Sequence, residues 1–233
     1  MKIIIHKNKD RGTADHGWLK TKFSFSFADW YEASRMGFGN LRVINDDTIM
    51  PNSGFGMHPH NNMEIITIVT KGEVTHEDSM GNNKKVVAGE IQVMSAGSGV
   101  VHSEYNKSGE EILKLYQIWI LPREENIKPS YGQKDFKKAQ DVNDLTMLVS
   151  PDGEDDSLSI NQDAYIYRGL FNEGKKTSYD LKNKNNGVYI FVVRGEVKID
   201  EVILEEGDAA GINEVSTLDM GFVANTEILL FEV

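Results

Sequence analysis

The chain contains no cysteine among its 233 residues. This excludes disulfide bridges, thiolate metal ligands and a cysteine nucleophile, so a bound metal has to be held by histidine and carboxylate side chains. Long apolar runs are also lacking. No run reaches the roughly 18 residues of a membrane-spanning helix, and the one near the N-terminus is too short for a signal peptide. We therefore expect a cytoplasmic protein without a membrane partner.

Basic residues are scarce relative to acidic ones, with 25 Lys and Arg against 36 Asp and Glu and a net charge of −11. The resulting field repels phosphate backbones, so we expect no direct nucleic-acid partner. A chain of 233 residues is long enough for one large β domain or for two domains of ordinary size.

A sustained helical period is missing as well, which favours an all-β fold. Short segments rich in β-branched and aromatic residues alternate with turn residues, and such a pattern is typical of barrels and sandwiches. Residues that tolerate positive φ at 71–72, 80–83, 185–187 and 194–195 predict hairpins. The expected strands include residues 41–44, 64–70, 90–94, 112–120, 189–193 and 228–233.

An internal repeat indicates two copies of one β unit. VTKGEV at residues 69–74 is echoed by VVRGEV at 192–197, and AGE at 88–90 by EGD at 206–208. Two prolines and a charge cluster lie between the copies, which predicts a linker and a boundary within residues 121–140.

Two pairs of potential metal ligands stand out, because the chain has only six histidines. His58 and His60 are two positions apart, as are His102 and Glu104. Side chains at i and i+2 of a strand point to the same face, so each pair can converge on one ion. Glu64 shares the parity of the first two histidines if their strand continues to it without a bulge.

Three histidines and one carboxylate form a nitrogen and oxygen site that suits Fe(II), Mn, Ni, Cu or Co, and four ligands leave two octahedral positions open for chemistry. Spacing alone leaves open whether the carboxylate comes from Glu104 or Glu64. His6 and His16 fit structural or surface roles, and His76 is a candidate for the pocket. Aromatic and soft side chains that suit either a pocket wall or the barrel core are Phe38, Phe55, Met57 and Met94.

Several motifs together resemble the pirin family, and more narrowly its bacterial members with two cupin barrels and quercetin 2,3-dioxygenase activity. The motifs are DHGWL at 15–19, FSFSF at 23–27, MGFGNLRVINDD at 36–47, GFGMHPH at 54–60 and MSAGSGVVHSEY at 94–105. The resemblance implies a bicupin of two jelly-roll barrels. We expect a metal-binding cupin over residues 1–125 and a degenerate cupin over residues 126–233.

The resemblance also implies one mononuclear divalent metal, with Fe(II) expected and Mn, Ni, Cu, Co or Zn as alternatives. The family's ligands correspond to His58, His60, His102 and Glu104. Glu104 would also take up a substrate proton, while Glu64 would orient an imidazole from behind the ligands. The arrangement with Glu64 as ligand and Glu104 as a free base stays open.

The implied reaction is the cleavage of a flavonol-like enolic substrate by dioxygen, with release of carbon monoxide. Two alternatives remain, namely a metal-binding regulatory protein with a protein partner, and another cupin metalloenzyme acting on a different substrate. We expect a monomer.

The repeat predicts which copy is active. The offset of 123 residues between Gly72 and Gly195 carries the first histidine pair onto residues without an imidazole or carboxylate, and the offset of 118 between Gly89 and Gly207 does the same for the second pair. We therefore expect no such metal centre in the second barrel. The corresponding residues are Leu181, Asn183, Met220 and Phe222.

Overall fold

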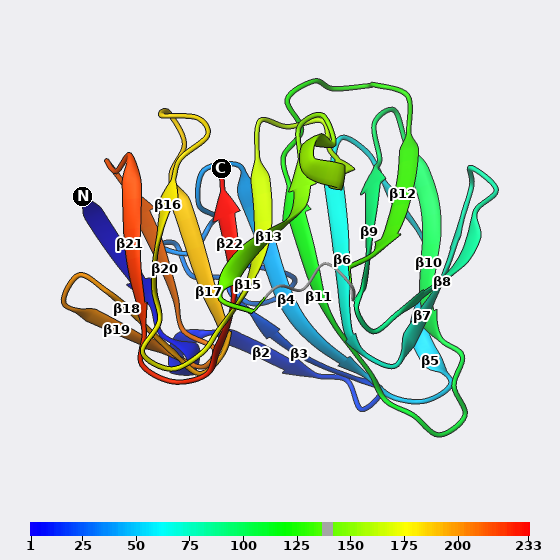
Figure 1. Ribbon diagram of the computed structural model, residues 1–233. Coiled ribbons are helices and arrows are strands. Elements are labelled where there is room, and N and C mark those ends of the chain that lie inside the picture. Colours follow the sequence, from blue (N-terminus) through cyan, green and yellow to red (C-terminus); the bar gives the residue numbers. More distant parts are fainter. Residues whose placement is uncertain (137–141) are drawn as a thin grey trace. The chain divides into compact units, whose positions relative to one another are not determined.

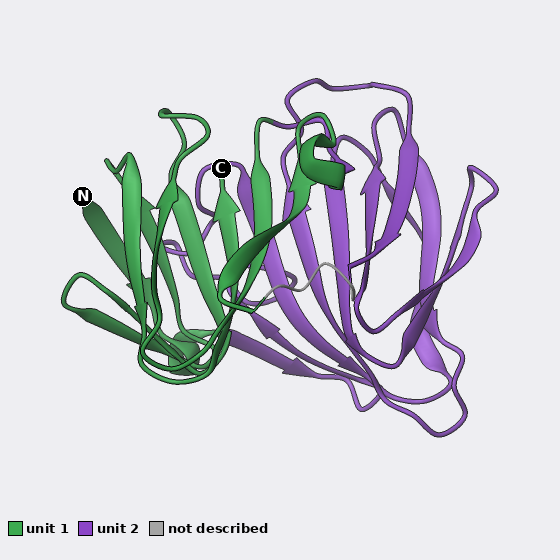
Figure 2. Ribbon diagram, in the orientation of Figure 1, with its two compact units in different colours: residues 1–11, 139–157, 163–233 green, residues 12–138, 158–162 purple. Residues whose placement is uncertain are grey.

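The computed structural model describes residues 1–136 and 142–233, and nearly all of the regular structure is β (Figure 1). Two compact units are distinguished (Figure 2). Unit 1 comprises residues 1–11, 139–157 and 163–233, and unit 2 comprises residues 12–138 and 158–162. The predicted all-β fold is confirmed.

Unit 2 is built from two antiparallel sheets. Its seven-stranded sheet has the order β12 (Ser130–Asp135), β9 (Glu90–Ser95), β6 (Glu64–Lys71), β11 (Leu113–Ile120), β4 (Leu41–Ile49), β3 (Leu19–Phe23) and β2 (Gly12–Asp15). Its four-stranded sheet has the order β5 (Ser53–His60), β10 (Val100–Asn106), β7 (Glu73–Asp78) and β8 (Asn83–Val87).

A row of polar residues crosses the larger sheet of unit 2 and positions the site. The pairing of β4, β11, β6 and β9 places Asn45, Gln117, Thr67 and Gln92 opposite one another in succession. Residues paired directly across a sheet point to the same face, so this face carries a polar band within an otherwise apolar interior. The neighbouring core is apolar and includes Leu19, Ile49, Val69, Val74, Val86, Leu113 and Leu115.

Unit 1 repeats this plan. Its larger sheet contains, in order, β1 (Lys2–His6), β20 (Ala209–Asn213), β17 (Val188–Arg194), β22 (Thr226–Glu232), β15 (Tyr165–Phe171) and β13 (Asp144–Ser150). Its four-stranded sheet has the order β16 (Lys176–Asp180), β21 (Thr217–Phe222), β18 (Glu196–Ile199) and β19 (Val202–Glu205). The remaining elements are η1 (Asn8–Asp10), η3 (Glu154–Asp156) and β14 (Leu158–Ser159).

In unit 1, four positions correspond, through the repeat, to the two ligand pairs of unit 2, and three of the four are apolar. Met220 and Phe222 are each 2% exposed and belong to the core of the unit, and Leu181 packs against that core. Asn183 is held by its backbone N–H, which donates to a carboxylate oxygen of Glu232 at 2.7 Å. These positions stabilise the barrel.

The predicted turns had mixed outcomes. Residues 80–83 join β7 to β8, which pair as a hairpin as predicted. Gly72 and Gly195 do have the positive φ that glycine favours, 75° and 83°, but each links a strand of the larger sheet to a strand of the smaller one. The hairpin prediction is wrong there, because the chain changes sheets at these corners. It is also wrong at 185–187, where β16 and β17 lie in different sheets.

The limits of the units differ from the expected boundary at residues 125 and 126. Strand β12 lies inside the stretch expected to be a linker, and it pairs with β9 over its whole length, which extends unit 2. Residues 137–140 of that stretch lie outside the described part of the chain. At the other end, β1 pairs with β20, so the first residues belong to unit 1.

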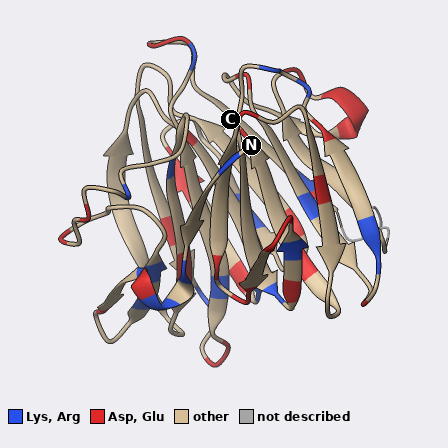
Figure 3. Ribbon diagram, turned by 90° about the vertical axis from the view of Figure 1, so that its left-hand side faces the viewer, with Lys and Arg blue, Asp and Glu red and all other residues tan. Residues whose placement is uncertain are grey.

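The charged residues are spread over the strands and loops. In the view of Figure 3, the described Lys and Arg residues are interspersed with Asp and Glu, and the short η3 turn is entirely acidic. Within the part of the chain that the structure describes, no helix has the length and apolar character that a membrane crossing requires.

Candidate metal centre

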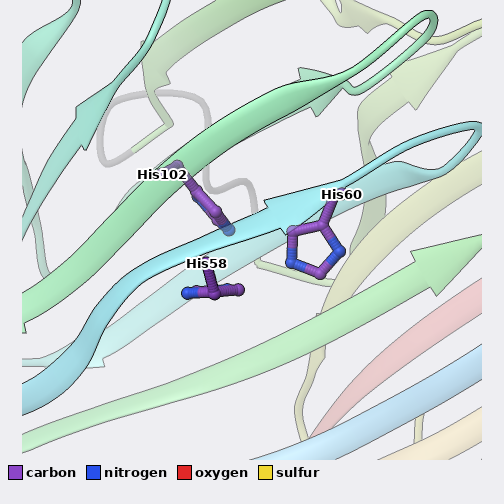
Figure 4. A group of neighbouring side chains, drawn as sticks. All are labelled: His58, His60 and His102. Atoms are coloured by element: carbon purple, nitrogen blue, oxygen red, sulfur yellow. The ribbon is translucent and has the colours of Figure 1, made fainter.

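Pairing of β5 with β10 brings the three predicted histidines together (Figure 4). His102 lies opposite His58, and Val100 lies opposite His60. The ring centroids are 4.4 Å apart for His58 and His102, 4.9 Å for His58 and His60, and 5.0 Å for His60 and His102. One ring nitrogen from each histidine lies within 4.8 Å of the other two, so the three can share one ion.

A β-bulge in β5 sets the orientation of His58. His102 pairs with His58 while Glu104 pairs with Phe55, so three residues of β5 span two of β10. The bulge leaves Gly56 and Met57 exposed and lets Phe55 and His58 face the same cavity. The Nδ1 of His58 lies 2.7 Å from the Gly56 carbonyl oxygen, and donation of its hydrogen there leaves Nε2 free to ligate.

Burial keeps the imidazoles of His60 and His102 in the neutral form that a metal requires. It lowers the pKa of His102 to about 3, with a further contribution from the neighbouring His58, and the same two causes lower the pKa of His60 to about 4. His102 is only 1% exposed, and both of its ring nitrogens lack a hydrogen-bond partner within the protein. A buried imidazole without hydrogen-bond partners is suited to act as a ligand of a divalent cation.

Glu104 is the carboxylate that lies beside His102, with one potential ligand atom of each in a common group. It is 2% exposed, and its Oε2 accepts a hydrogen bond from Gln117 at 2.6 Å. Its Oε1 accepts from the hydroxyl of Thr67 at 3.0 Å and from the amide of Gln92 at 3.2 Å. Burial raises the pKa of Glu104, so a bound cation would be needed to hold the charged form there.

His76 lies behind the ligands. Its Nε2 is 2.8 Å from a carboxylate oxygen of Asp78, and its Nδ1 is 3.3 Å from the amide nitrogen of Gln92. One potential ligand atom each from His76, His102 and Glu104 also lies within 4.8 Å of the other two. His76 is fully buried and does not line the cavity, contrary to the expectation that it faces the pocket.

Glu64 was expected to ligate the metal or to orient an imidazole, but its contacts are elsewhere. Strand β5 ends at His60, and Glu64 begins β6 in the other sheet, so the assumed common strand does not exist. Its position three residues before Thr67 places it on the opposite face of β6. Its Oε2 accepts from the Ser95 hydroxyl at 2.6 Å and from the Asn161 backbone N–H at 3.1 Å. This corrects the expectation that Glu64 ligates the metal or orients an imidazole.

A cavity of about 270 Å³ opens beside the cluster and is lined by His58, His60 and Glu104. Aromatic rings form much of its wall. Phe27 packs edge-on against Trp119 with centroids 5.3 Å apart, and Trp119 in turn packs against His60 at 5.0 Å. A flat apolar wall next to a metal suits an aromatic ligand.

Of the residues expected to line the pocket, only one lines the cavity. Phe55 lines the cavity, as expected. Met57 is 60% exposed, because strand alternation turns it away from His58. Phe38 and Met94 are buried but do not line the cavity, and Met94 packs in the core with Ile65 and Val100.

Sequence reasoning missed the part of the wall that comes from β3, β4 and β11. The signal that could have found its residues is alternation along these strands, but which inward-facing residues reach the cavity depends on which strands pair. His16, expected in a structural or surface role, is exposed and lines the cavity. The missed residues with polar or aromatic side chains are Thr21, Phe23, Phe27, Asn45, Asp47, Gln117 and Trp119.

Known proteins show the same organisation. Residues 5–120 match the Pirin family, and residues 147–233 match the quercetinase C-terminal cupin domain. A protein of Escherichia coli K12 named quercetin 2,3-dioxygenase is 43% identical over 231 residues, which cover 99% of this chain and 98% of that protein. A pirin-like protein of Caulobacter vibrioides is 42% identical over 232 residues, covering 99% of each.

A solved structure adds a metal to the comparison. The crystal structure of the bacterial pirin YhhW from Escherichia coli in complex with nickel(II) superposes with a TM-score of 0.94 and 43% identity, covering 100% of this chain and 99% of that one. The nickel complex and the histidine and glutamate site of this chain together support a single divalent metal. The predicted bicupin fold and family are confirmed, and the chain belongs to the pirin family.

Proposed function

We propose that this protein is a metal-dependent dioxygenase that cleaves an enolic aromatic substrate of the flavonol type and releases carbon monoxide. The observation that carries the proposal is the cluster of His58, His60 and His102, in which His102 also groups with Glu104. His58, His60 and Glu104 line an aromatic-walled cavity beside this cluster. The quercetin 2,3-dioxygenase name of the Escherichia coli relative supports the same activity. Iron as the metal, a cytoplasmic location and a monomeric state remain predictions from the sequence.

His58, His60, His102 and Glu104 would hold a divalent metal, which would supply the Lewis acidity that lowers the pKa of a substrate hydroxyl. The aromatic wall of Phe23, Phe27 and Trp119 orients a flat ring and excludes water from the reacting face.

Glu104 is the group placed to hold the substrate proton. Its carboxylate lines the cavity beside His58 and His60, where an oxygen not used by the metal would accept the proton of a substrate hydroxyl. Gln117 and Thr67 hold the carboxylate through hydrogen bonds of 2.6 and 3.0 Å, so it stays in place as its charge changes.

The size of the cavity favours a second candidate, a related cupin metalloenzyme with a smaller enolisable substrate. About 270 Å³ lies just below the range of roughly 300 to 1,000 Å³ typical of pockets that enclose drug-sized ligands. A one- or two-ring enol fits this volume, whereas a three-ring flavonol would extend beyond it.

The test is carbon monoxide release and oxygen uptake with quercetin. Anaerobically iron-loaded protein is compared with chelated protein and with His102→Ala. Thr13→Val serves as a control because Thr13 is exposed and does not line the cavity. We expect turnover that needs both the metal and His102. No turnover with iron, manganese, nickel or copper would reject the flavonol reaction, and turnover of a smaller enol instead would support the second candidate.

A further inference from the structure

Two polar atoms on the cavity wall have no hydrogen-bond partner within the protein. They are the Oδ1 of Asn45 on β4 and the Oγ1 of Thr21 on β3, and both side chains line the cavity. Asn45 is 4% exposed and Thr21 is 5% exposed. A buried polar atom left unpaired costs about 1 to 3 kcal/mol, so these two atoms favour an occupant of the cavity that supplies the missing hydrogen bonds.

The register of the sheet places the two groups close together. Thr21 pairs with Asp47, and Phe23 pairs with Asn45, so Thr21 and Asn45 are diagonal neighbours on one face. Diagonal neighbours are about 7 to 8 Å apart at their Cα atoms. The histidine pair belongs to β5 in the other sheet, so the ligand cluster and these polar groups come from different walls of the same cavity.

Two further polar side chains lie on β11, and only one of them has a hydrogen-bond partner within the protein. Gln117, which pairs with Asn45 across the sheet, donates to Glu104. Trp119 is two residues further along β11, lines the cavity, and has an indole Nε1 that is buried without a partner. The wall therefore offers an acceptor at Asn45, a donor at Trp119, and at Thr21 a hydroxyl that can act as either.

This combination selects for a particular ligand chemistry. The rings of Phe23 and Phe27 lie 5.4 Å apart on the same wall and suit a flat aromatic body. A plain hydrocarbon ring would leave the three polar groups unpaired, and sites built for hydrogen bonding reject analogues that lack the matching groups. Phenolic hydroxyls both donate and accept, so they match the wall.

We propose that Thr21, Asn45 and Trp119 form a second recognition subsite that selects aromatic substrates carrying phenolic hydroxyls in addition to the oxygen that faces the histidine cluster. The inference rests on the proposed function for the identity of the reacting oxygen. It adds that these further hydroxyls, and not the enol alone, determine which substrate binds.

The test compares two flavonols that share the reacting enol. Quercetin carries four hydroxyls that 3-hydroxyflavone lacks. Dissociation constants are measured anaerobically by tryptophan fluorescence quenching, with nickel-loaded and metal-free protein, so that turnover is not needed. The variants are Asn45→Leu and Thr21→Val, which keep the side-chain size, and Thr13→Val is the control on an exposed strand position.

We expect the unmodified protein to prefer quercetin by about tenfold or more, as the loss of one or two buried hydrogen bonds predicts. Each cavity variant should reduce this preference at least about fivefold, by weakening the binding of quercetin relative to that of 3-hydroxyflavone, and Thr13→Val should change neither value. Equal affinity for both flavonols in the unmodified protein, or a preference that survives in Asn45→Leu and Thr21→Val, would overturn the subsite.

A second probe pair separates the subsite from the proposed reaction. Phenol and toluene are compared by ligand-observed NMR with metal-free protein and with Asn45→Leu. If neither flavonol binds but phenol binds in preference to toluene and loses this preference in Asn45→Leu, the flavonol reaction fails and the subsite stands. If the phenol preference is also independent of Asn45, the subsite is rejected.

Discussion

Glu104 is a carboxylate in a fully buried position, and the groups that hold it are neutral. The donors are the amides of Gln117 and Gln92 and the hydroxyl of Thr67, all from the polar row across the larger sheet. Neutral donors fix the position of the carboxyl group and add no positive charge of their own, so its negative charge is left for a cation that binds beside it. The polar row therefore prepares the site for a metal before one binds.

Substitution of Gln117 tests this role. Gln117→Leu removes the donor to Oε2 and leaves that oxygen facing an apolar side chain, so we expect the affinity for nickel(II) to fall about 10- to 100-fold. The measurement is a competition titration against a chelator. Gln133→Leu is the matched control, since Gln133 donates to the Lys85 carbonyl and to Glu90. Unchanged nickel affinity in folded Gln117→Leu would show that Gln117 does not support Glu104.

At the level of residues, local spacing was informative and distant pairing was not. Alternation along a strand predicted that His58 and His60 share a face, and the resemblance to the pirin family implied that His102 joins them; the nitrogens of the three do lie together. The position of Glu64 could not be predicted, because it depends on a sheet change after His60. Asn45 lines the cavity only through the pairing of β4 with β11, which no local pattern specifies.

At the scale of elements, the close approach of β5 to β10 controls the geometry of the ligands. A Cβ atom at Gly54 would lie 2.4 Å from the Glu104 carbonyl oxygen and 2.5 Å from the Cα of Tyr105, so any larger side chain has to separate the strands. Gly56 lies two residues further along β5, and a Cβ there would meet nothing within 4 Å.

These two glycines make a matched pair of variants. We expect Gly54→Ala to lower the free energy of unfolding by about 1 to 3 kcal/mol and to weaken nickel binding, because the backbone that carries Glu104 must shift. Gly56→Ala should change both quantities little. Thermal unfolding and nickel titration of the two variants are the measurements, and equal behaviour of the pair would contradict the role of strand approach.

Element prediction succeeded for strands and was weaker for their connections. The apolar and β-branched runs that form β6 and β17 are buried strands, so their composition was sufficient to predict them as strands. The glycines at 72 and 195 were correctly assigned to turns, but a positive φ is compatible with a hairpin or with a corner between sheets. Only the packing of two sheets decides between these alternatives.

At the scale of the whole molecule, the depressed histidine pKa values affect stability. His102 has a pKa of about 3 in the folded, metal-free protein, against about 6.5 in an unfolded chain. Above pH 6.5 both states are neutral at this residue. Below it the unfolded state takes up a proton that the folded state does not, so the contribution of His102 to stability falls as the pH falls, and it levels off near pH 3.

We expect this contribution to appear as a difference between variants. Burial raises the pKa of Glu64 and Glu104, which acts in the opposite direction at mildly acidic pH, so the total pH dependence is a mixture. In metal-free protein, His102→Gln should gain stability over the unmodified chain by a few kcal/mol between pH 7 and pH 4. Urea unfolding measures it, the exposed His16→Gln is the control, and a constant difference would contradict it.

The assignment of β1 to unit 1 has a consequence for synthesis of the protein. Strand β1 (Lys2–His6) pairs with β20 (Ala209–Asn213), which is made some 200 residues later, whereas all segments of unit 2 have been synthesised by residue 162. On the ribosome, the metal-binding unit can therefore complete its sheets while the apolar segment KIIIH waits without a partner. An unpaired apolar strand is prone to aggregation, so the nascent chain depends on chaperones most during this interval.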